Sequence, residues 1–151
     1  MPTHARVEDA FNFAKHDAVT RGRKDVDVDA LFIGLLHEAG LAVSMLGHAG
    51  VDLMKLREPI RDRIDALMVK VPDEMTANPE VASILMDARA LAEERKQDHV
   101  SSLHVFHAVL KRASPRVLEL IKAAGGTREQ VLASIESVLP PPERPGASEN
   151  T

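Results

Sequence analysis

Apolar side chains recur near the N-terminus at the spacing of one helical face, three or four residues apart. The positions on this face are Val7, Ala10, Phe11, Ala14 and Ala18. Because residues at this spacing return to the same side of an α-helix, the pattern predicts a helix here. A polar loop follows at 21–25. A second helix is predicted to begin near Asp27, whose carboxylate can accept hydrogen bonds from free backbone N–H groups.

The same pattern occurs a second time, and Val81 follows Val7 by 74 residues. Other matched pairs keep this shift and are mainly small or apolar: Ala14/Ala88, Ala18/Ala92, Val26/Val100, Phe32/Phe106, Leu36/Leu110 and Leu46/Leu120. One inserted residue near Gly125 carries the match to the end of the pattern. Since the repeated content is a packing pattern, the duplication predicts two copies that build one body with related faces.

Each copy is predicted to contain four helices. The third is short, at about 42–46 in the first copy and from Ser114-Pro115 in the second. Asp52 and Thr127 are predicted to cap the fourth helices. Pro59 lies inside the first copy's fourth helix, so a kink or break is expected there. The predicted fold class is therefore all-α, an eight-helix, pseudo-twofold, duplicated four-helix repeat.

The 151 residues have the size of one domain. We predict a domain over 1–139, with repeat one at about 4–68 and repeat two at about 78–139. Asn78-Pro79 has the composition of a cap and first turn for repeat two. Three prolines at 140–142 end the helical pattern, and 140–151 is predicted to be a disordered, Pro-rich tail.

Composition excludes several classes of partner. The formal charge is -4, and basic residues alternate with acidic ones, as at 57–63, so no basic stripe for nucleic acid is expected. The four phenylalanines are the only aromatic residues, too few for a base-stacking surface. The apolar stretch 30–36 is far shorter than the roughly 20 residues of a membrane span. Without cysteines or a signal-like start, a cytoplasmic location with no membrane partner is expected.

The central segments carry a family resemblance. Residues 26–36 read Val-Asp-Val-Asp-Ala-Leu-Phe-Ile-Gly-Leu-Leu, residues 100–110 read Val-Ser-Ser-Leu-His-Val-Phe-His-Ala-Val-Leu, and residues 46–52 read Leu-Gly-His-Ala-Gly-Val-Asp. In this register the pattern resembles the double Clp-N repeat, the N-terminal domain of the Clp unfoldases, over about 4–139. The resemblance implies an eight-helix domain that receives substrates or adaptor proteins. No Gly-x-x-x-x-Gly-Lys-Ser/Thr motif occurs, so a stand-alone Clp-N protein that acts by contact is expected.

The resemblance also implies where a partner would bind. In some family members, a glutamate in each repeat recognises phosphorylated arginine. That position is Asp29 in the first copy and Leu103 in the second. A carboxylate at Asp29 can pair with a guanidinium group, whereas Leu103 cannot. The residues implied for partner or peptide binding are Asp27, Val28, Asp29, Ser102, Leu103 and His104. The alternative for the acidic segment 25–29 is a solvated loop with a helix cap.

Candidates for reaction chemistry are weak. His104 and His107 lie three residues apart on a predicted helix, a spacing that can place two imidazoles on one metal ion. Two ligands leave a closed site incomplete, so no metal and no cofactor are predicted. No glycine-framed serine occurs, and no catalytic residue is predicted.

The functional prediction is a non-enzymatic protein- or peptide-binding module of the Clp chaperone-protease system. Its partners would be Clp ATPase or protease subunits, adaptors, or their substrates. Roles as adaptor, decoy or regulator fit the sequence equally well. The alternative is a helical small-molecule or metal-binding protein on the same scaffold, with Phe and Met side chains near the repeat interface lining an apolar pocket.

Overall fold

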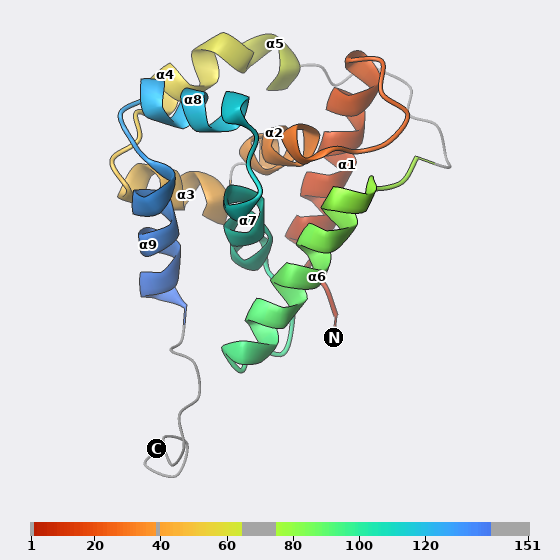
Figure 1. The fold of residues 1–151 in the computed structure, drawn as a ribbon, viewed down its shortest axis with the longest axis vertical. Coiled ribbons are helices and arrows are strands. Elements are labelled where there is room, and N and C mark those ends of the chain that lie inside the picture. Colours follow the sequence, from red (N-terminus) through yellow and green to blue (C-terminus); the bar gives the residue numbers. More distant parts are fainter. Residues whose placement is uncertain (1, 39, 65–74, 140–151) are drawn as a thin grey trace.

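The computed structural model describes residues 2–38, 40–64 and 75–139, whose regular elements are helices (Figure 1). They are, in order, α1 (Ala5–Thr20), α2 (Val28–Glu38), α3 (Leu41–His48), α4 (Leu53–Arg57), a 3-10 turn η1 (Glu58–Ile60), α5 (Arg61–Ile64), α6 (Pro79–Glu94), α7 (Ser102–Lys111), α8 (Pro115–Ala123) and α9 (Arg128–Val138). The all-α prediction is confirmed. With α4, η1 and α5 taken as one interrupted helix, the described residues contain the predicted eight helices.

The helix boundaries follow from local chemistry. Asp52 accepts from the backbone N–H groups at the start of α4, and Asn78 does the same for α6. Thr127 and Gln130 form a reciprocal capping box at α9. Pro59 lies in the 3-10 turn, where its missing N–H interrupts the α-helical hydrogen bonds. The predicted caps and the predicted break are therefore confirmed.

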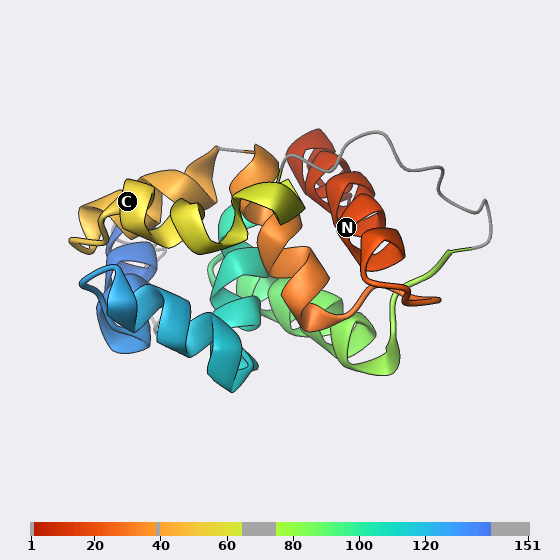
Figure 2. The same cartoon turned by 90° about the horizontal axis from the view of Figure 1, so that it is seen from above.

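The two repeats meet through their second helices. α2 and α7 contact each other, and α2 also contacts α6 while α7 contacts α1 (Figure 2). Phe32 of α2 and Phe106 of α7 are both fully buried, with ring centroids 6.4 Å apart. These matched side chains therefore occupy equivalent positions at the interface between the repeats.

Each repeat also lends its leading segment to the other. Thr3 forms a parallel bridge with Val100, and Ala77 forms one with Val26. Ala77 is the counterpart of Thr3, and Val100 that of Val26, because both are shifted by 74 residues. The hydrogen bonds correspond as well: His4 N donates to the carbonyl of Val100 at 2.8 Å, and Asn78 N to that of Val26 at 2.9 Å. The pseudo-twofold relation therefore extends to single hydrogen bonds.

The exchange continues at the opposite end of the molecule. α3 of the first repeat packs on α9 of the second, and α8 of the second packs on α4 of the first. The backbone N–H of Asp52 donates to the carbonyl of Ala124 at 2.8 Å. The main buried cluster contains residues of both repeats, so each repeat completes part of the core of the other.

The two repeats differ in how closely their first two helices approach. A Cβ atom on Gly34 of α2 would lie 2.1 Å from the carbonyl oxygen of Ala10 in α1, which is far inside contact distance. The counterpart of Gly34 in α7 is Ala108, whose methyl group does not allow α6 and α7 to approach as closely. In keeping with this difference, α1 and α2 make a more extensive contact than α6 and α7.

A buried ion pair anchors α5 to α1. Asp17 is 1% exposed and accepts two hydrogen bonds from Arg63, at 2.8 and 2.9 Å, and one from Arg21 Nε at 3.0 Å. A buried carboxylate needs such charged partners to offset the loss of its hydration. The counterpart of Asp17 in the second repeat is Leu91, which packs against the apolar core.

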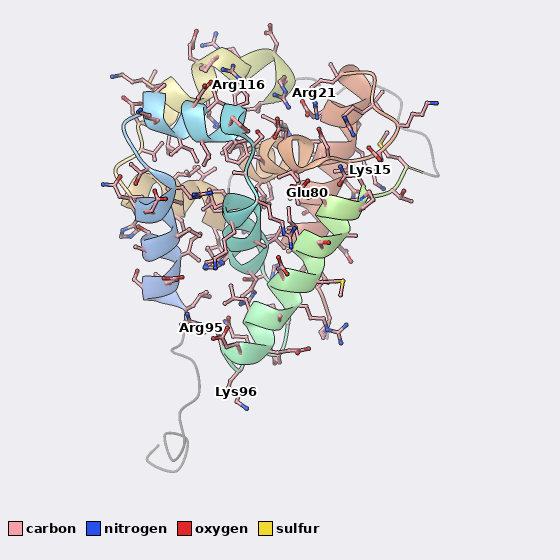
Figure 3. The ribbon with its side chains drawn as sticks, viewed as in Figure 1. Lys15, Arg21, Glu80, Arg95, Lys96 and Arg116 are labelled. Atoms are coloured by element: carbon pink, nitrogen blue, oxygen red, sulfur yellow. The ribbon has the colours of Figure 1, made fainter. Side chains whose placement is uncertain are left out.

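The loops after α1 and α6 both contain a residue with positive φ at the equivalent position, although the residues differ. Gly22 has φ 75° just past the end of α1, and its counterpart Lys96 has φ 59° just past the end of α6. Figure 3 shows Lys96 at this end of α6. Positive φ values favour glycine because it has no Cβ. Lys96 adopts this conformation without that advantage, so the turn is imposed by the surrounding fold.

Two predictions concern residues outside this description. The tail at 140–151 and the end of repeat one, up to 68, lie outside the described residues. Among the described residues, no single helix has the length and hydropathy needed to cross a membrane. α2 and α3 meet these criteria only when taken together, and they are bent by 90° relative to each other.

Candidate functional site

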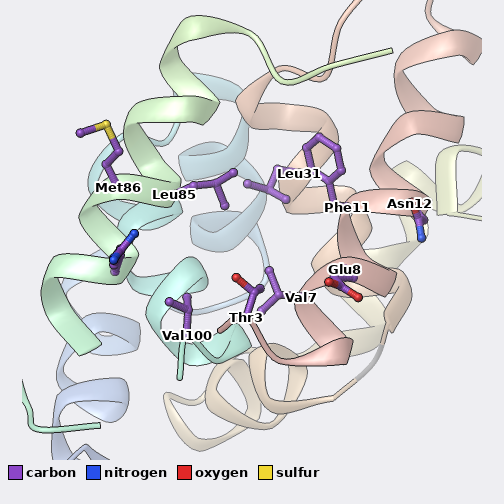
Figure 4. Close-up of a pocket in the computed structure, with 10 residues that line it drawn as sticks. Thr3, Val7, Glu8, Phe11, Asn12, Leu31, Leu85, Met86 and Val100 are labelled. Carbon is purple, nitrogen blue, oxygen red and sulfur yellow. The ribbon is translucent and has the colours of Figure 1, made fainter. Parts of the chain in front are cut away.

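An apolar pocket of about 590 Å³ lies between α1 and α6 (Figure 4). Its apolar walls are formed by Val7, Phe11, Leu31, Leu85, Met86 and Val100. Figure 4 shows Leu31 of α2 and Leu85 of α6 pointing toward each other inside it. The alternative of a small-molecule site had Phe and Met side chains near the repeat interface lining such a pocket, and Phe11 and Met86 are among its lining residues.

The pocket draws on equivalent positions of both repeats. Leu85 is the counterpart of Phe11, and Met86 is the counterpart of Asn12, each shifted by 74 residues. All four line the same space. The pocket therefore spans the pseudo-twofold axis and exists only because the two repeats fold together.

Polar groups border these apolar walls. Thr3, Glu8 and Asn12 lie on one side, and Arg89 of α6 lies on the other. Arg89 Nε is 3.2 Å from Glu93, and both side chains are more than half exposed, so this ion pair is weak and can be exchanged. The pocket can thus bury apolar groups of a ligand, while the polar side chains at its border form hydrogen bonds with polar groups of the same ligand.

Four of the six residues that the family resemblance implied for binding lie in the interior: Val28, Ser102, Leu103 and His104, each at most 8% exposed. Asp27 is partly accessible but is occupied locally. It accepts from the backbone of Ala30 at the start of α2 and forms ion pairs with Arg21 and Arg23. Burial opposes ionisation, but these hydrogen bonds and charges lower the pKa of Asp27 below its usual value.

Asp29 differs from its neighbours. It lies in the first turn of α2, is half-buried, and makes no side-chain hydrogen bond or ion pair in the part of the chain that the structure describes. Of the six residues, it therefore keeps a carboxylate that is both accessible and unsatisfied within that part. Neither of the two pockets described here includes it.

His104 has a structural role in α7. Its Nδ1 accepts a hydrogen bond from the backbone N–H of Ser101 at 2.8 Å, so the proton lies on Nε2, which donates to Gln97 Oε1. Burial, with the nearby His99 and His107 adding to it, lowers the pKa of His104 to about 4. The imidazole is therefore neutral and fixed at physiological pH.

The other histidine of this pair is also engaged. His107 Nε2 lies 3.1 Å from Glu136 of α9, which ties α7 to α9. Among the described residues, no group of three or more His, Asp or Glu side chains is placed to hold a metal ion.

A second pocket, of about 440 Å³, lies on the other side of the Thr3–Val100 bridge and is lined by polar residues that include Arg6 and Ser102. Glu38 already neutralises this region, since it pairs with Arg6 at 2.7 Å and accepts from Gly40 N at 3.0 Å. The larger apolar pocket is the better candidate site because its walls have no such internal partner.

The sequence reasoning identified the repeat interface but not the residues of the pocket. Periodicity places Phe11 on the buried face of α1, and the matched Leu85 on that of α6. Which of these side chains face a gap depends on how α1 and α6 diverge, which no local pattern specifies. A usable signal was present at 11–12 and 85–86, where equivalent positions carry large side chains beside the small residues of the core face.

Comparison with known proteins agrees with this architecture. Residues 3–114 match the family model of the Clp repeat (R) N-terminal domain. A search among curated protein sequences finds no relative that matches this chain.

Three solved structures illustrate the similarity of fold. The Hsp104 N-terminal domain from Candida albicans has a TM-score of 0.69 at 14% identity, covering 89% of this chain and 89% of that one. The N-terminal domain of the caseinolytic protease associated chaperone ClpD from Arabidopsis thaliana has a TM-score of 0.67 at 16% identity, covering 89% and 92%. A chain from work on a malarial protein secretion system has a TM-score of 0.69 at 18% identity, covering 91% and 94%. From its match to the family model over most of its length, the chain belongs to the Clp N-terminal-domain family.

Proposed function

We propose that this chain is a protein-binding module that holds an extended apolar segment of another polypeptide in the pocket between α1 and α6. The observation that carries the proposal is the apolar wall built from matched positions of both repeats, Phe11 and Leu85. Burial of apolar surface is the main driving force for such contacts. Membership of a family whose N-terminal domains receive substrates and adaptors supports the same role.

The border of the pocket favours a polypeptide. Met86 is 72% exposed beside the apolar walls of the pocket, so a segment bound there could extend its apolar contact onto this side chain. Glu8 on α1 and Arg89 on α6 place opposite charges on the two sides. Such groups can pair with the polar backbone and side chains that flank an apolar segment.

Within the Clp system, the proposed role is contact without reaction, as adaptor, decoy or regulator. We further propose Asp29 as a contact for a cationic group, such as an arginine side chain, in the bound partner. The rival, a small-molecule site, is favoured by one observation: a volume of about 590 Å³ lies within the usual range of ligand pockets, roughly 300–1,000 Å³.

Fluorescence polarisation with a labelled twelve-residue peptide rich in Leu and Phe tests the proposal. Leu85→Gln places a polar side chain in the pocket and is expected to weaken binding about tenfold. Leu132→Gln is the matched control, because Leu132 is also partly buried against the core but does not line the pocket. It is expected to change the affinity less than twofold. Thermal melts would establish that both variants are folded.

Equal affinities of the two variants would show that the peptide does not bind in this pocket. A wild-type chain that binds no apolar peptide at millimolar concentration, yet is stabilised by a small apolar compound, would favour the rival.

A further inference from the structure

We propose that Met86 is a modification site: its oxidation by peroxide to the sulfoxide closes the pocket between α1 and α6 to apolar segments. This inference rests on the proposed function and adds a means of regulating it. It concerns the described methionine that is both exposed and part of the pocket lining.

Exposure separates the four methionines within the described residues into two pairs. Met45 and Met75 are 5% and 6% exposed, whereas Met54 and Met86 are 83% and 72% exposed. Since oxidation of a thioether requires contact with the oxidant, the exposed pair reacts first. Of these two, Met86 lines the pocket and Met54, on α4, does not.

Position makes Met86 sensitive to polarity. Figure 4 shows it on α6 next to Leu85, with its thioether directed away from Leu31 at the outer edge of the pocket. An apolar segment that fills the pocket and extends past Leu85 over this edge would cover the thioether of Met86. In the unmodified protein this contact is favourable, because a methionine side chain is flexible and adapts to irregular apolar partners.

The chemistry is a two-electron oxidation. The sulfur attacks one oxygen of a peroxide, the O–O bond breaks, and an S=O bond forms. With hydrogen peroxide the other oxygen leaves as water, so the sulfur is oxidised and the peroxide is reduced. Methionine sulfoxide reductases restore the thioether, which makes the modification reversible.

The product is unsuited to an apolar interface. The sulfoxide oxygen is a strong hydrogen-bond acceptor, and covering it without a donor carries a cost. An apolar segment brings no donor for this oxygen, and Arg89, three residues further on, could supply one only by giving up its 3.2 Å contact with Glu93. Oxidation is therefore expected to weaken the binding of an apolar segment about tenfold.

The same geometry predicts a reciprocal effect. A bound segment shields Met86 but leaves Met54 in solvent, so the ratio of Met86 to Met54 sulfoxide should fall when the peptide is present. Met54 serves as an internal control in the same sample, because it meets the same dose of peroxide.

The experiment uses the full chain, hydrogen peroxide and the labelled Leu- and Phe-rich peptide. Peptide mass spectrometry measures the sulfoxide at each methionine, and fluorescence polarisation measures affinity before and after treatment. We expect wild type and Met54→Leu to lose about tenfold in affinity once Met86 is oxidised. Met86→Leu should keep its own starting affinity after peroxide, whichever other methionines react.

Unchanged affinity of wild type with Met86 fully oxidised would overturn the inference, as would an equal loss in Met86→Leu. These results differ from failure of the proposed function, in which the untreated wild-type protein would not bind the peptide at all.

Discussion

At the residue scale, His104 replaces the glutamate or glutamine that usually forms the third position of a capping box. Its Nδ1 accepts from Ser101 N, and its buried ring holds no charge at neutral pH because its pKa is lowered to about 4. In an unfolded chain the same ring has an ordinary pKa of 6.5. Protons therefore bind the unfolded state more tightly between these two values.

This difference predicts a pH dependence of stability. The contribution of neutral His104 is complete above pH 6.5 and is lost as the pH falls toward 4. Loss of this contribution should lower the free energy of unfolding by about 2 kcal/mol between pH 7 and pH 5. His104→Gln keeps an acceptor for Ser101 N but cannot titrate, so its loss over this interval should be smaller by about that amount. Urea denaturation at the two pH values measures it; parallel losses in both proteins would contradict the assignment.

Asp29 gives the second prediction at this scale. Because Asp29 has no side-chain partner within the described residues, Asp29→Ala should leave the protein folded and lower the melting temperature only slightly, through the loss of a negative charge in the first turn of α2. Binding of an apolar peptide that also carries an arginine should weaken about fivefold, as expected for the loss of a partly exposed ion pair of about 1 kcal/mol. Asp25→Ala is the control, since Asp25 pairs with Arg23. Isothermal titration calorimetry measures the affinity. If the Asp29→Ala variant binds the peptide with the wild-type affinity, Asp29 is not part of the site.

The helix caps could be predicted from the sequence because each depends on residues close together in the chain. The caps at Asp52, Asn78 and Thr127 depend on side chains that reach two or three residues ahead, and spacing along the chain determines them. The burial of Ser102 and Leu103 is different, because the start of α7 is covered by residues from elsewhere in the fold. No local pattern carries that information.

At the element scale, Gly34 sets the distance between α1 and α2. A methyl group there would lie 2.1 Å from the backbone oxygen of Ala10, so the helices must separate to accept it. Gly34→Ala is expected to lower the free energy of unfolding by about 1–3 kcal/mol or more. Gly47→Ala is the matched control, since its nearest neighbour would be a Leu53 methyl at 4.0 Å.

In the control, alanine is the better helix former in α3 and should raise stability by about 0.5 kcal/mol. Chemical denaturation of both variants gives the comparison. Equal effects of the two substitutions would show that α1 and α2 are not in such close contact.

The elements themselves were predictable because periodicity and breakers are properties of the chain. The interruption at Pro59 follows from one missing N–H group and one rigid ring. What the pattern did not contain is the pairing of elements, such as α3 with α9 and α8 with α4. These contacts join residues far apart in sequence, so they depend on the assembled core.

At the scale of the whole molecule, the duplication explains why a pocket exists. The Thr3–Val100 and Val26–Ala77 bridges tie each leading segment to the other repeat. α2 and α7 lie between the first helices of the two repeats, since α2 contacts α6 and α7 contacts α1. α1 and α6 thus lie on either side of α2 and α7, and the pocket between them is lined by residues of both repeats.

The all-α class, the pseudo-twofold relation and the equivalence of matched positions such as Phe32 and Phe106 could be predicted from the repeated apolar positions. The pocket could be anticipated only as a place near the interface. Its residues, among them Leu85 and Met86, are defined by the angle between two helices that belong to different repeats. The positions implied by the resemblance at 102–104 are buried at the start of α7, and Ser102 lines the second pocket.

The most direct test of the account is to titrate the unlabelled apolar peptide into the ¹⁵N-labelled chain and follow its amide resonances. If both repeats form one binding pocket, residues around Phe11 of α1 and around Leu85 of α6 should shift together with a single dissociation constant. The Leu85→Gln variant should lose both sets of shifts. Shifts confined to one repeat, or centred on α4 around Met54, would contradict the account.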